Sequence, residues 1–514
     1  MRVALRTDAS GRIGTGHVRR CLSLARALAD EGVECLLVCR AHDAVSAAAV
    51  SGFAHVAWLP QARIDAIPAA GDTAHAAWAG VAWHRDAEET VQALAEFNPD
   101  WVLVDHYAFD ARWQQVVAQA TGARMAVIDD LADRPHWAEL LIDQNLQPPT
   151  GDKYAGCIAP NTRTLLGPRH ALLARDYATA PRYPFRRKVR SIGIFLSGSD
   201  ATDAACTALL ACREIAGFTG AIELVSSSHS PQLASQQELA ARWPDTHVLT
   251  DLPDLRAFFA RHDLQIGSGG GAAWERCCIG APTVAVQIAA NQGAVLPQLA
   301  ALGAVEWIDP ADPQRLGAAV GRLVAQPRAR LALARAARGL VDGLGSARVA
   351  AVLALASDPR LAFRDATAQD EALLLEWAND PHARAQGFHP ERISPRQHHA
   401  WFAARLARPQ DCLLLIATSP AGMPVGVLRF EREDAHWTIS YSLDPAFRGW
   451  GHGQRLLAGG IEALQRRIGP ATVQGWVRRD NAASLRIFRA LGFDETRADR
   501  GGELCHLFSG TSRR

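Results

Sequence analysis

Short apolar runs separated by amphipathic segments mark the first two thirds of the chain. Residues 3–5, 32–39 and 100–105 are mostly apolar, with runs such as 35–39 and 101–104 that have no polar position, which is typical of strands buried on both faces of a parallel sheet. Segments with helical spacing, such as residues 21–30, lie between them. The pattern predicts a Rossmann-like α/β domain over residues 1–185.

The same pattern starts again after a basic stretch at residues 183–188. Residues 192–196 predict a strand, residues 197–200 a turn, and the residues from Ala201 onward a helix. A second Rossmann-like domain is therefore expected over residues 186–357, so that the chain carries a pair of such domains.

The pattern changes in the last third of the chain. Residues 412–417 and 424–430 predict antiparallel strands joined by a turn, and residues 437–443 predict a strand that leads into a helix at 454–465. These elements predict a third domain of the α+β class over residues 361–510.

Composition agrees with a folded protein of several domains. A chain of 514 residues is too long for one core, and 54 Lys+Arg against 53 Asp+Glu leave a net charge of +1, which indicates neither a nucleic acid nor a membrane as partner. The 10 cysteines have irregular spacings typical of buried reduced thiols. Met1 leads directly into a strand without a signal peptide, and no apolar stretch is long enough to span a bilayer, so we expect a soluble cytoplasmic protein.

A glycine-rich turn links the first predicted strand to the first helix. Gly11, Gly14 and Gly16 permit a tight turn and leave room for a ligand against main-chain amides at the positive end of the helix. His17 stands at the helix start, where the dipole favours the neutral imidazole that a general base needs. The turn suits a phosphate or sugar hydroxyls; the alternative is a histidine that only caps the helix.

Polar side chains also follow two later strands. In parallel sheets ligands gather at the carboxyl ends of strands, which draws attention to Asp105 and Tyr107, and a phenol there can bond a sugar hydroxyl. The alternative for Asp105 is a loop cap. Asp129 and Asp130 lack a further metal ligand, so we expect a helix cap followed by solvent.

A second glycine-rich turn precedes a helix in the second domain. Four glycines between residues 267 and 271 follow a short strand, which predicts a second phosphate cradle. Glu275 lies about one turn into the helix, within reach of both hydroxyls of a ribose; the alternative is a surface helix residue.

The order of these motifs resembles one enzyme family. Gly-x-Gly-His-x-x-Arg at 14–20, Asp-His-Tyr at 105–107, Gly-Gly-Gly-x-x-Trp-Glu-Arg-Cys at 269–277 and Asn291-Gln292 are similar to the UDP-2,4-diacetamido-2,4,6-trideoxy-β-L-altropyranose hydrolases of the pseudaminic acid pathway. The resemblance spans roughly residues 1–355. It implies a GT-B-like pair of domains that binds UDP mainly on the second domain and releases UDP to water without a metal.

The resemblance also implies roles for residues. His17 would activate water for attack at the anomeric carbon, and Asn291 and Tyr107 would hold sugar or water. Ribose and phosphate binding fall to Glu275, Gly269, Gly270 and Gly271, and the other positions for UDP-sugar binding are Gly14, Gly16, Arg19, Asp105, Ser199 and Leu252. Related sequences often carry Asp where this chain has Ala290, so that carboxylate contact is in doubt here.

The last third carries a motif of another family. Arg448-x-x-Gly451-x-Gly453 between a strand and a helix, followed by the pattern from Asn481 to Phe493, resembles the GNAT acetyltransferases. The resemblance implies that loop amides grip the pyrophosphate of acetyl-CoA and that main-chain groups near Leu443 pair with its pantetheine arm. The positions it assigns to acetyl-CoA are Leu443, Arg448, Gly449, Gly451, His452, Gly453, Gln454, Asn481 and Ser484.

This chain departs from the GNAT pattern at the position of the acid. Many relatives have Tyr where this chain has Phe488, and a phenyl ring cannot donate a proton to the leaving thiolate. Glu431 and His436 are candidates for the base, although solvated strand positions account for both. His398 and His399 lack a matching metal partner and are expected on a helix surface.

Together the two resemblances imply consecutive reactions. The predicted function is 4-N-acetylation of UDP-4-amino-4,6-dideoxy-N-acetyl-β-L-altrosamine by acetyl-CoA, followed by hydrolytic release of UDP from the diacetamido product. The alternatives are a GT-B glycosyltransferase with an appended acetyltransferase, the equivalent steps of the legionaminic acid pathway, and a non-enzymatic sensor of nucleotide sugar and acetyl-CoA.

Overall fold

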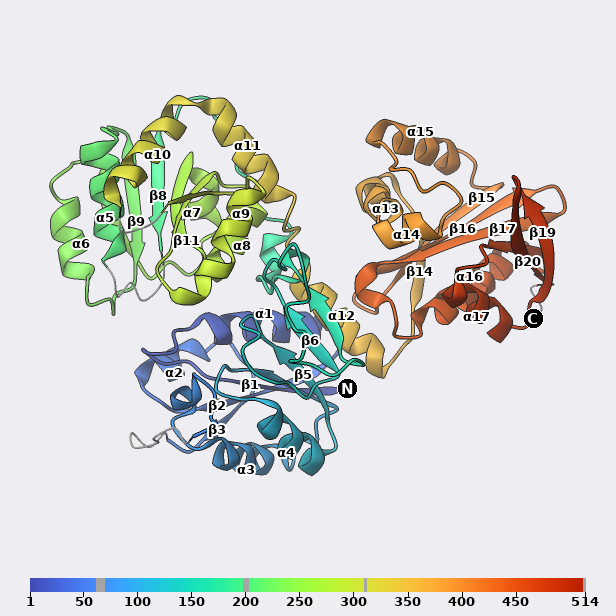
Figure 1. Cartoon of the computed structure of the whole chain (residues 1–514), viewed down its shortest axis with the longest axis horizontal. Coiled ribbons are helices and arrows are strands. Elements are labelled where there is room, and N and C mark those ends of the chain that lie inside the picture. The colour runs from blue at the N-terminus through green and yellow to red at the C-terminus, as the bar shows by residue number, and fades with distance from the viewer. Residues whose placement is uncertain (62–69, 197–202, 309–311, 512–514) are drawn as a thin grey trace. The chain divides into compact units, whose positions relative to one another are not determined.

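The computed structural model describes residues 1–61, 70–196, 203–308 and 312–511. The chain divides into two compact units, Met1–Ala350 and Ala351–Arg514, and each is described by itself. The first unit contains two parallel sheets, and the second contains one mostly antiparallel sheet (Figure 1).

The first sheet has the strand order β3-β2-β1-β4-β5-β6-β7, and every neighbouring pair is parallel. Its strands are β1 (Arg2–Thr7), β2 (Glu34–Arg40), β3 (Val56–Leu59), β4 (Trp101–Asp105), β5 (Arg124–Ile128), β6 (Leu140–Asp143) and β7 (Arg163–Leu166). The helices of this part are α1 (Gly16–Asp30), α2 (Ala44–Ala49), η1 (Ala76–Ala79), α3 (Trp83–Leu94), α4 (Ala111–Thr121), η2 (Pro168–His170) and η3 (Arg175–Tyr177).

Helices cover both faces of this sheet, as its uninterrupted apolar strands require. Val102, Val104 and Met125 pack with side chains of α3 and α4, whereas α1 packs against β1 and β2. The strand order reverses at β1, which has β2 on one side and β4 on the other. The carboxyl ends of β1 and β4 therefore form the position where open α/β sheets bind ligands.

The second sheet repeats this architecture with the order β10-β9-β8-β11-β12-β13, again parallel throughout. Its strands are β8 (Ser191–Phe195), β9 (Ala221–Ser226), β10 (Thr246–Thr250), β11 (Leu264–Ser268), β12 (Thr283–Val286) and β13 (Glu306–Ile308). Its helices are α5 (Ala204–Leu210), η4 (Ala211–Ile215), α6 (Leu233–Ala240), α7 (Arg256–Arg261), α8 (Gly271–Ile279), η5 (Ala290–Ala294), α9 (Leu296–Ala301), α10 (Pro313–Ala325) and α11 (Pro327–Arg338).

Two cores enclose the second sheet, one on each face. Ile192, Ile194 and Ile222 pack with α5 and α10. The core of the other face gathers side chains of α7, α8, α9 and α11. The following helix, α12 (Gly345–Ser357), begins where a Cβ on Gly345 would overlap the main chain of Ala171, so glycine permits a close approach of the two segments.

The third sheet has the order β14-β15-β16-β17-β18-β20-β19. Its strands are β14 (Ala362–Asp365), β15 (Cys412–Thr418), β16 (Pro424–Glu433), β17 (His436–Leu443), β18 (Thr472–Val477), β19 (Asp494–Arg500) and β20 (Glu503–Thr511). Its helices are η6 (Ala368–Asp370), α13 (Glu371–Ala378), α14 (Pro381–Gln386), α15 (Pro395–Leu406), η7 (Pro445–Phe447), α16 (His452–Ile468) and α17 (Ala482–Ala490).

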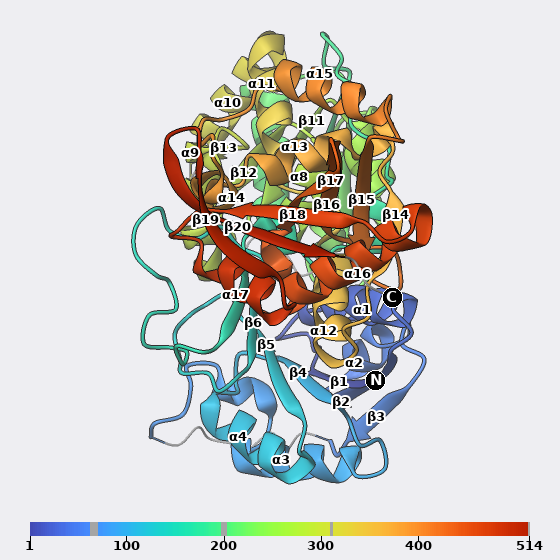
Figure 2. The ribbon, with the colours of Figure 1, turned by 90° about the vertical axis from the view of Figure 1, so that its right-hand side faces the viewer.

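Side-chain alternation on β15 buries both faces of this sheet. Leu413 and Leu415 join the core with α16 and α17, whereas Leu414 and Ile416 join the core with α13 and α15. Figure 2 shows these two pairs of helices on opposite faces of the sheet. β17 and β18 are the parallel pair, and their pairing ends at Ile439 opposite Gly475 although both strands continue. The main chain of β17 beyond Ile439 therefore has β16 on one side and no paired β18 on the other.

The fold class predicted from the sequence is confirmed: two parallel α/β sheets precede an α+β domain. The predicted hairpin corresponds to β15 and β16, and the predicted helix at 454–465 lies within α16. The turn predicted at 197–200 lies outside the described residues. Among the helices that the structure describes, none has the length and apolar character needed to cross a bilayer.

Candidate active site

His17 lies in the first turn of α1, at the carboxyl ends of β1 and β4, where the first sheet reverses its strand order. Gly14 has φ +79° and donates its amide to the Ser10 carbonyl at 2.8 Å, so the turn closes before the helix begins. The Nδ1 atom of His17 lies 2.6 Å from Oδ1 of Asp105, the last residue of β4. The alternatives in which His17 caps the helix or Asp105 caps a loop are wrong, because the two side chains bind each other.

Arg20, one turn along α1, fixes the same carboxylate. Its Nε and Nη2 atoms donate to the two oxygens of Asp105, both at 2.6 Å, and the carboxylate is fully buried. Burial alone would raise the pKa of Asp105, but the positive charge of Arg20 and the bonds from Arg20 and His17 hold it well below the usual range. Asp105 is therefore ionised, accepts the proton of Nδ1 and leaves Nε2 of His17 as the basic nitrogen.

Tyr107 and Asp130 extend this network. The Tyr107 hydroxyl donates to Asp130, whose carboxylate also pairs with Arg20 at 3.2 Å. Burial and the Asp130 charge raise the pKa of Tyr107 well above its usual value, so the phenol stays protonated. Tyr107 was expected to offer its hydroxyl to a sugar, whereas the structure uses that hydroxyl to hold Asp130.

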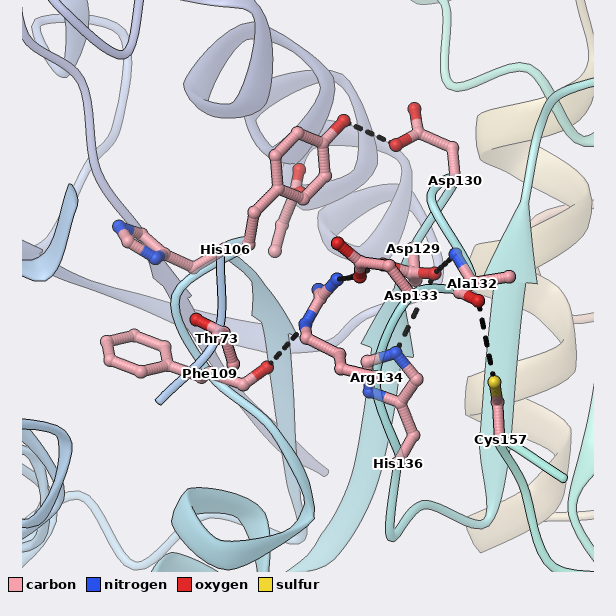
Figure 3. A network of polar contacts seen from close by, with 12 residues as sticks. Thr73, His106, Phe109, Asp129, Asp130, Ala132, Asp133, Arg134, His136 and Cys157 are labelled. Carbon is pink, nitrogen blue, oxygen red and sulfur yellow. Dashed lines mark hydrogen bonds and ion pairs between the residues drawn. The ribbon is translucent and has the colours of Figure 1, made fainter. Parts of the chain in front are cut away.

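Asp129 has a different environment from the expected helix cap followed by solvent, and that expectation is wrong. Its carboxylate is fully buried, pairs with Arg134 at 2.9 Å and accepts the Ala132 amide at 2.8 Å (Figure 3). The Arg134 Nε atom donates to the Phe109 carbonyl at 2.9 Å. Arg134 therefore links Asp129, after β5, to the segment after β4.

A buried ionic cluster below the site was missed by sequence reasoning. Asp8, directly after β1, pairs with Arg6 and accepts the amide of Arg40, the last residue of β2, at 2.7 Å. His42 and His106 each lie 3.2 Å from the second oxygen of Asp8. The cluster therefore ties together the carboxyl ends of β1, β2 and β4. Its one sequence signal is the charged residues inside apolar runs, such as Arg6 between Leu5 and Thr7.

Two aromatic rings contact the ring of His17, and His75 packs against both of them. The ring centroid of Tyr107 lies 4.6 Å from that of His17, and Trp78 lies 6.2 Å from it. His75 contacts both Trp78 and Tyr107, at 4.8 and 5.4 Å. His75 and Trp78 come from the loop and short helix between β3 and α3, which the sequence analysis did not single out.

The second glycine-rich turn precedes α8, and its glycines serve different purposes. A Cβ on Gly269 would overlap Leu296, so packing against α9 requires glycine there. The Gly269 amide donates to Oε1 of Gln292 at 3.3 Å and is thus already engaged. Gly271 begins α8 with open space beside it, and a Cβ on the preceding Gly270 would make only ordinary contacts with Gln292 and Ser268, so these two glycines remain the candidates for contact with phosphate.

Glu275 is half-buried and engaged, so the alternative of a surface helix residue is wrong. Its carboxylate accepts a hydrogen bond from Tyr177 of η3, and its pKa is raised by burial while the charge of Arg19 on α1 opposes that rise. Arg19 is exposed and Tyr177 is buried. Predicted residues from the two sheets of the first unit therefore lie within electrostatic range of each other.

The remaining predicted residues of this unit are placed as follows. Asn291 is exposed on η5, and Leu252 is half-buried beside the core that contains α7 and α8. Ser199 lies outside the described residues. In the described ranges no group of three or more His, Cys, Asp or Glu side chains has an arrangement that could hold a metal ion, and metal-independent chemistry stays a prediction.

In the second unit, the predicted pyrophosphate loop lies at the start of α16. Gly449 and Gly451 have φ +78° and +80°, a conformation that favours glycine, and α16 begins at His452. A Cβ on Gly453 would overlap Ile487, so this glycine lets α16 pack against α17. Consecutive amides at the start of a long helix suit a pyrophosphate.

Several side chains predicted at this loop are engaged within the protein. Arg448 donates to the Leu443 carbonyl at 3.0 Å and pairs with Asp380 at 2.7 Å. His452 is buried, and its imidazole lies 6.4 Å from the Phe447 ring, so the side chain faces the core. Gln454 is exposed.

Asn481 and Ser484 at the start of α17 also have internal partners. Asn481 caps this helix by accepting the Ser484 amide at 3.0 Å, and the Ser484 hydroxyl accepts a hydrogen bond from Tyr441 at 3.0 Å. Tyr441 lies on β17 beyond the end of its pairing with β18. Phe488 is buried, and its ring stacks on Phe508 with centroids 4.9 Å apart.

Two expectations about polar residues of this unit need correction, those for Glu431 and His398. Glu431 is half-buried among arginines rather than solvated, with Arg405 at 3.3 Å. His436 is half-buried on β17. His398 is buried against Phe402, because α15 turns this position toward the sheet, whereas His399 is exposed as expected.

Comparisons with known proteins find different relatives for the two compact units of the chain. Residues 360–494 match the family model of the acetyltransferase (GNAT) domain, so the chain carries a GNAT domain. Over 306 residues it is 22% identical to the UDP-2,4-diacetamido-2,4,6-trideoxy-beta-L-altropyranose hydrolase of Campylobacter jejuni, covering 59% of this chain and 97% of that protein.

Two further likenesses concern the first unit. Over 205 residues the chain is 27% identical to the spore coat polysaccharide biosynthesis protein SpsG of Bacillus subtilis, covering 38% of this chain and 58% of that protein. A crystal structure of MurG from Acinetobacter baumannii aligns with 68% of this chain and 98% of its own length, with 15% identity and a TM-score of 0.46. By sequence, the N-terminal region thus resembles the Campylobacter hydrolase and SpsG, and a GNAT domain follows it.

Proposed function

We propose that the chain is a bifunctional enzyme of nucleotide-sugar biosynthesis. Its GNAT domain would acetylate the 4-amino group of UDP-4-amino-4,6-dideoxy-N-acetyl-β-L-altrosamine. Its first unit, divided near residue 185, would release UDP from the diacetamido product. The observation that carries the hydrolytic half is the His17–Asp105 pair at the carboxyl end of the first sheet. The 22% identity to the Campylobacter hydrolase supports the substrate class.

The geometry at His17 suits activation of water. Asp105 holds the proton on Nδ1, so Nε2 accepts the proton of a water molecule while the oxygen of that water bonds to the anomeric carbon. The bond between that carbon and the UDP oxygen breaks, UDP leaves with the electron pair, and the proton on His17 passes to solvent. Gly270, Gly271 and the start of α8 would hold the departing phosphates, and Glu275 the ribose.

The residues present fit acetyl-CoA, which would supply the acetyl group. The amides following Gly449 and Gly451 would hold its pyrophosphate, and the main chain of β17 beyond Ile439 would receive its pantetheine arm. Arg448 would position this strand end through its bond to the Leu443 carbonyl. Because Phe488 is packed in the core, the proton for the thiolate would come from water or another hydroxyl.

One experiment tests both halves. The protein is incubated with the UDP-4-amino sugar with and without acetyl-CoA, and products are followed by mass spectrometry. With acetyl-CoA we expect CoA, UDP and the free diacetamido sugar, and the UDP-diacetamido sugar alone should release UDP in buffer. A requirement for a second sugar or a lipid acceptor would indicate a glycosyltransferase, and binding without turnover would indicate a sensor. Preference for a legionaminic precursor would move the same chemistry to that pathway.

A further inference from the structure

The loop between β3 and α3 carries two aromatic side chains to His17. Trp78 lies in η1 and His75 directly precedes it. Their centroids are 4.8 Å apart, and the Trp78 ring is 5.5 Å from the Tyr107 ring. Together His75, Trp78 and Tyr107 form what we call the aromatic wall, which stands beside the imidazole of His17.

The wall differs from ordinary core packing in its exposure. His75 and Trp78 are both half-buried, although each is in ring contact with the nearly buried Tyr107. Burial lowers the pKa of His75, so its ring is neutral near pH 7 and presents an uncharged surface. Partly exposed rings next to a proposed catalytic base are a binding surface for apolar atoms of a ligand.

The segment before the wall is fastened to the site. The Thr73 hydroxyl donates to the Ala108 carbonyl at 3.1 Å, just after β4, and Arg112 of α4 donates to the Gly71 carbonyl at 3.1 Å (Figure 3 shows Thr73 beside the His106–Phe109 segment). On the side of Tyr107, Arg134 places its guanidinium 5.6 Å from the ring centroid. The rings are thus held in place before a ligand arrives, which reduces the entropy lost on binding.

We propose that the aromatic wall receives the sugar of the nucleotide sugar and selects sugars with apolar substituents. This inference rests on the proposed function, because it places the anomeric carbon at His17. A diacetamido-trideoxy sugar carries a methyl group at C6 and on each acetamido group, and these groups and the C–H faces of the ring pack well against aromatic faces. His75 and Trp78 are then specificity-determining residues, and UDP itself binds elsewhere.

The test separates the sugar from the nucleotide. In a His17→Ala background, which prevents turnover, calorimetry measures binding of UDP and of the UDP-diacetamido sugar to chains with Trp78, Trp78→Phe and Trp78→Ala. We expect Trp78→Ala to weaken binding of the UDP-sugar about tenfold, because the stacking contact with the sugar is lost, while UDP binds as before. Trp78→Phe keeps a ring and should lose less, and a His75→Ala variant should behave like Trp78→Ala.

Two outcomes would overturn the inference. One is unchanged binding of the UDP-sugar in Trp78→Ala, and the other is an equal loss for UDP and the UDP-sugar, which indicates a general structural effect. UDP-GlcNAc, with hydroxyls at C4 and C6, tests the selectivity. Trp78→Ala should change its affinity less than the affinity of the UDP-diacetamido sugar. The proposed function fails separately, if the chain with His17 releases no UDP from the diacetamido sugar.

Discussion

The first and the third sheets each present a glycine-containing turn at the start of a helix, but they build their sites in different ways. At α16 the proposed ligand groups are main-chain amides following Gly449 and Gly451, all within a few residues of each other. At α1 the reactive group is the side chain of His17, and its partner Asp105 is 88 residues away in sequence. One site is set by local backbone geometry, and the other needs the whole first sheet to fold.

The largest expected effect is the removal of the His17 side chain. His17→Ala should lower UDP release about 10³-fold, because the proton of the attacking water loses its acceptor, whereas acetyl transfer should keep its rate. UDP release is measured by a coupled assay, and CoA release by a thiol reagent. His84→Ala, on α3, is the matched control and should leave both rates unchanged. Equal loss of both activities in His17→Ala would contradict two separate sites.

A change in the loop before α16 should have the opposite result, with acetyl transfer lowered and UDP release kept. Gly451→Trp should lower kcat/KM for acetyl-CoA about 100-fold, because φ +80° strains any side chain and an indole fills the space in front of the amides. UDP release should be unchanged. Gly422→Ala, at φ +90° in the turn between β15 and β16, has similar backbone strain away from the loop and serves as control. A similar loss in this control would assign the effect to strain alone.

The same contrast explains what could be predicted from the sequence. The turns at Gly14 and Gly451 and the strands around them follow from local patterns, and the structure confirms them. The bonds of Asp105 to His17 and Arg20 depend on the order of the strands, which no local pattern encodes.

The misassigned residues show the same limit. Asp129 was expected to be a helix cap followed by solvent, and its partner Arg134 could not be foreseen because Arg134 follows a loop whose path the sequence does not reveal. Trp78 lies in a segment without clear periodicity, so nothing marked its ring as a neighbour of His17.

Asp105 tests whether the first site depends on its distant partner. Asp105→Asn keeps the size of the side chain but removes the charge that fixes the proton on Nδ1, so kcat for UDP release should fall about 100-fold. KM should change little, because Asp105 is fully buried and both of its carboxylate oxygens are bonded to His17 or Arg20. The pH profile of kcat should also shift, which a purely structural role would not cause. An unchanged profile with a raised KM would instead indicate a direct contact with substrate.

The Asp8 cluster should make the first unit sensitive to acid. Although burial raises it, the pKa of Asp8 is held well below the usual range by Arg6 and by bonds from His106 and His42. A depressed folded pKa means that this stabilisation is complete above the unfolded pKa of about 4 and is lost as pH falls below it.

Asp8→Asn should therefore lower the free energy of unfolding by about 3 kcal/mol at pH 7, where it leaves Arg6 with one buried carboxylate partner instead of two, and by less near pH 3. Chemical denaturation followed by circular dichroism at both pH values measures the difference. The exposed pair of Arg360 with Asp358 offers the control, because Asp358→Asn should have almost no effect at either pH. A pH-independent loss in Asp8→Asn would contradict the role of its charge.

The smallest effect is expected at Phe488. A change at this position tests whether the second site depends on a side chain, as the first site does. Phe488→Tyr restores the residue that many GNAT sequences carry. Its ring end abuts Gly475 of β18 and it stacks on Phe508, so an added hydroxyl would be buried in an apolar core. We expect acetyl transfer within about twofold of the original rate and a loss of about 1–2 kcal/mol of stability, measured by steady-state kinetics and denaturation. Tyr441→Phe is the comparison. Tyr441 lies on the strand end proposed to receive the pantetheine arm, and this change removes the hydroxyl that donates to Ser484. If Phe488→Tyr raised acetyl transfer tenfold or more, the ring would face the reacting thiol, and the contrast between a main-chain site and a side-chain site would not hold.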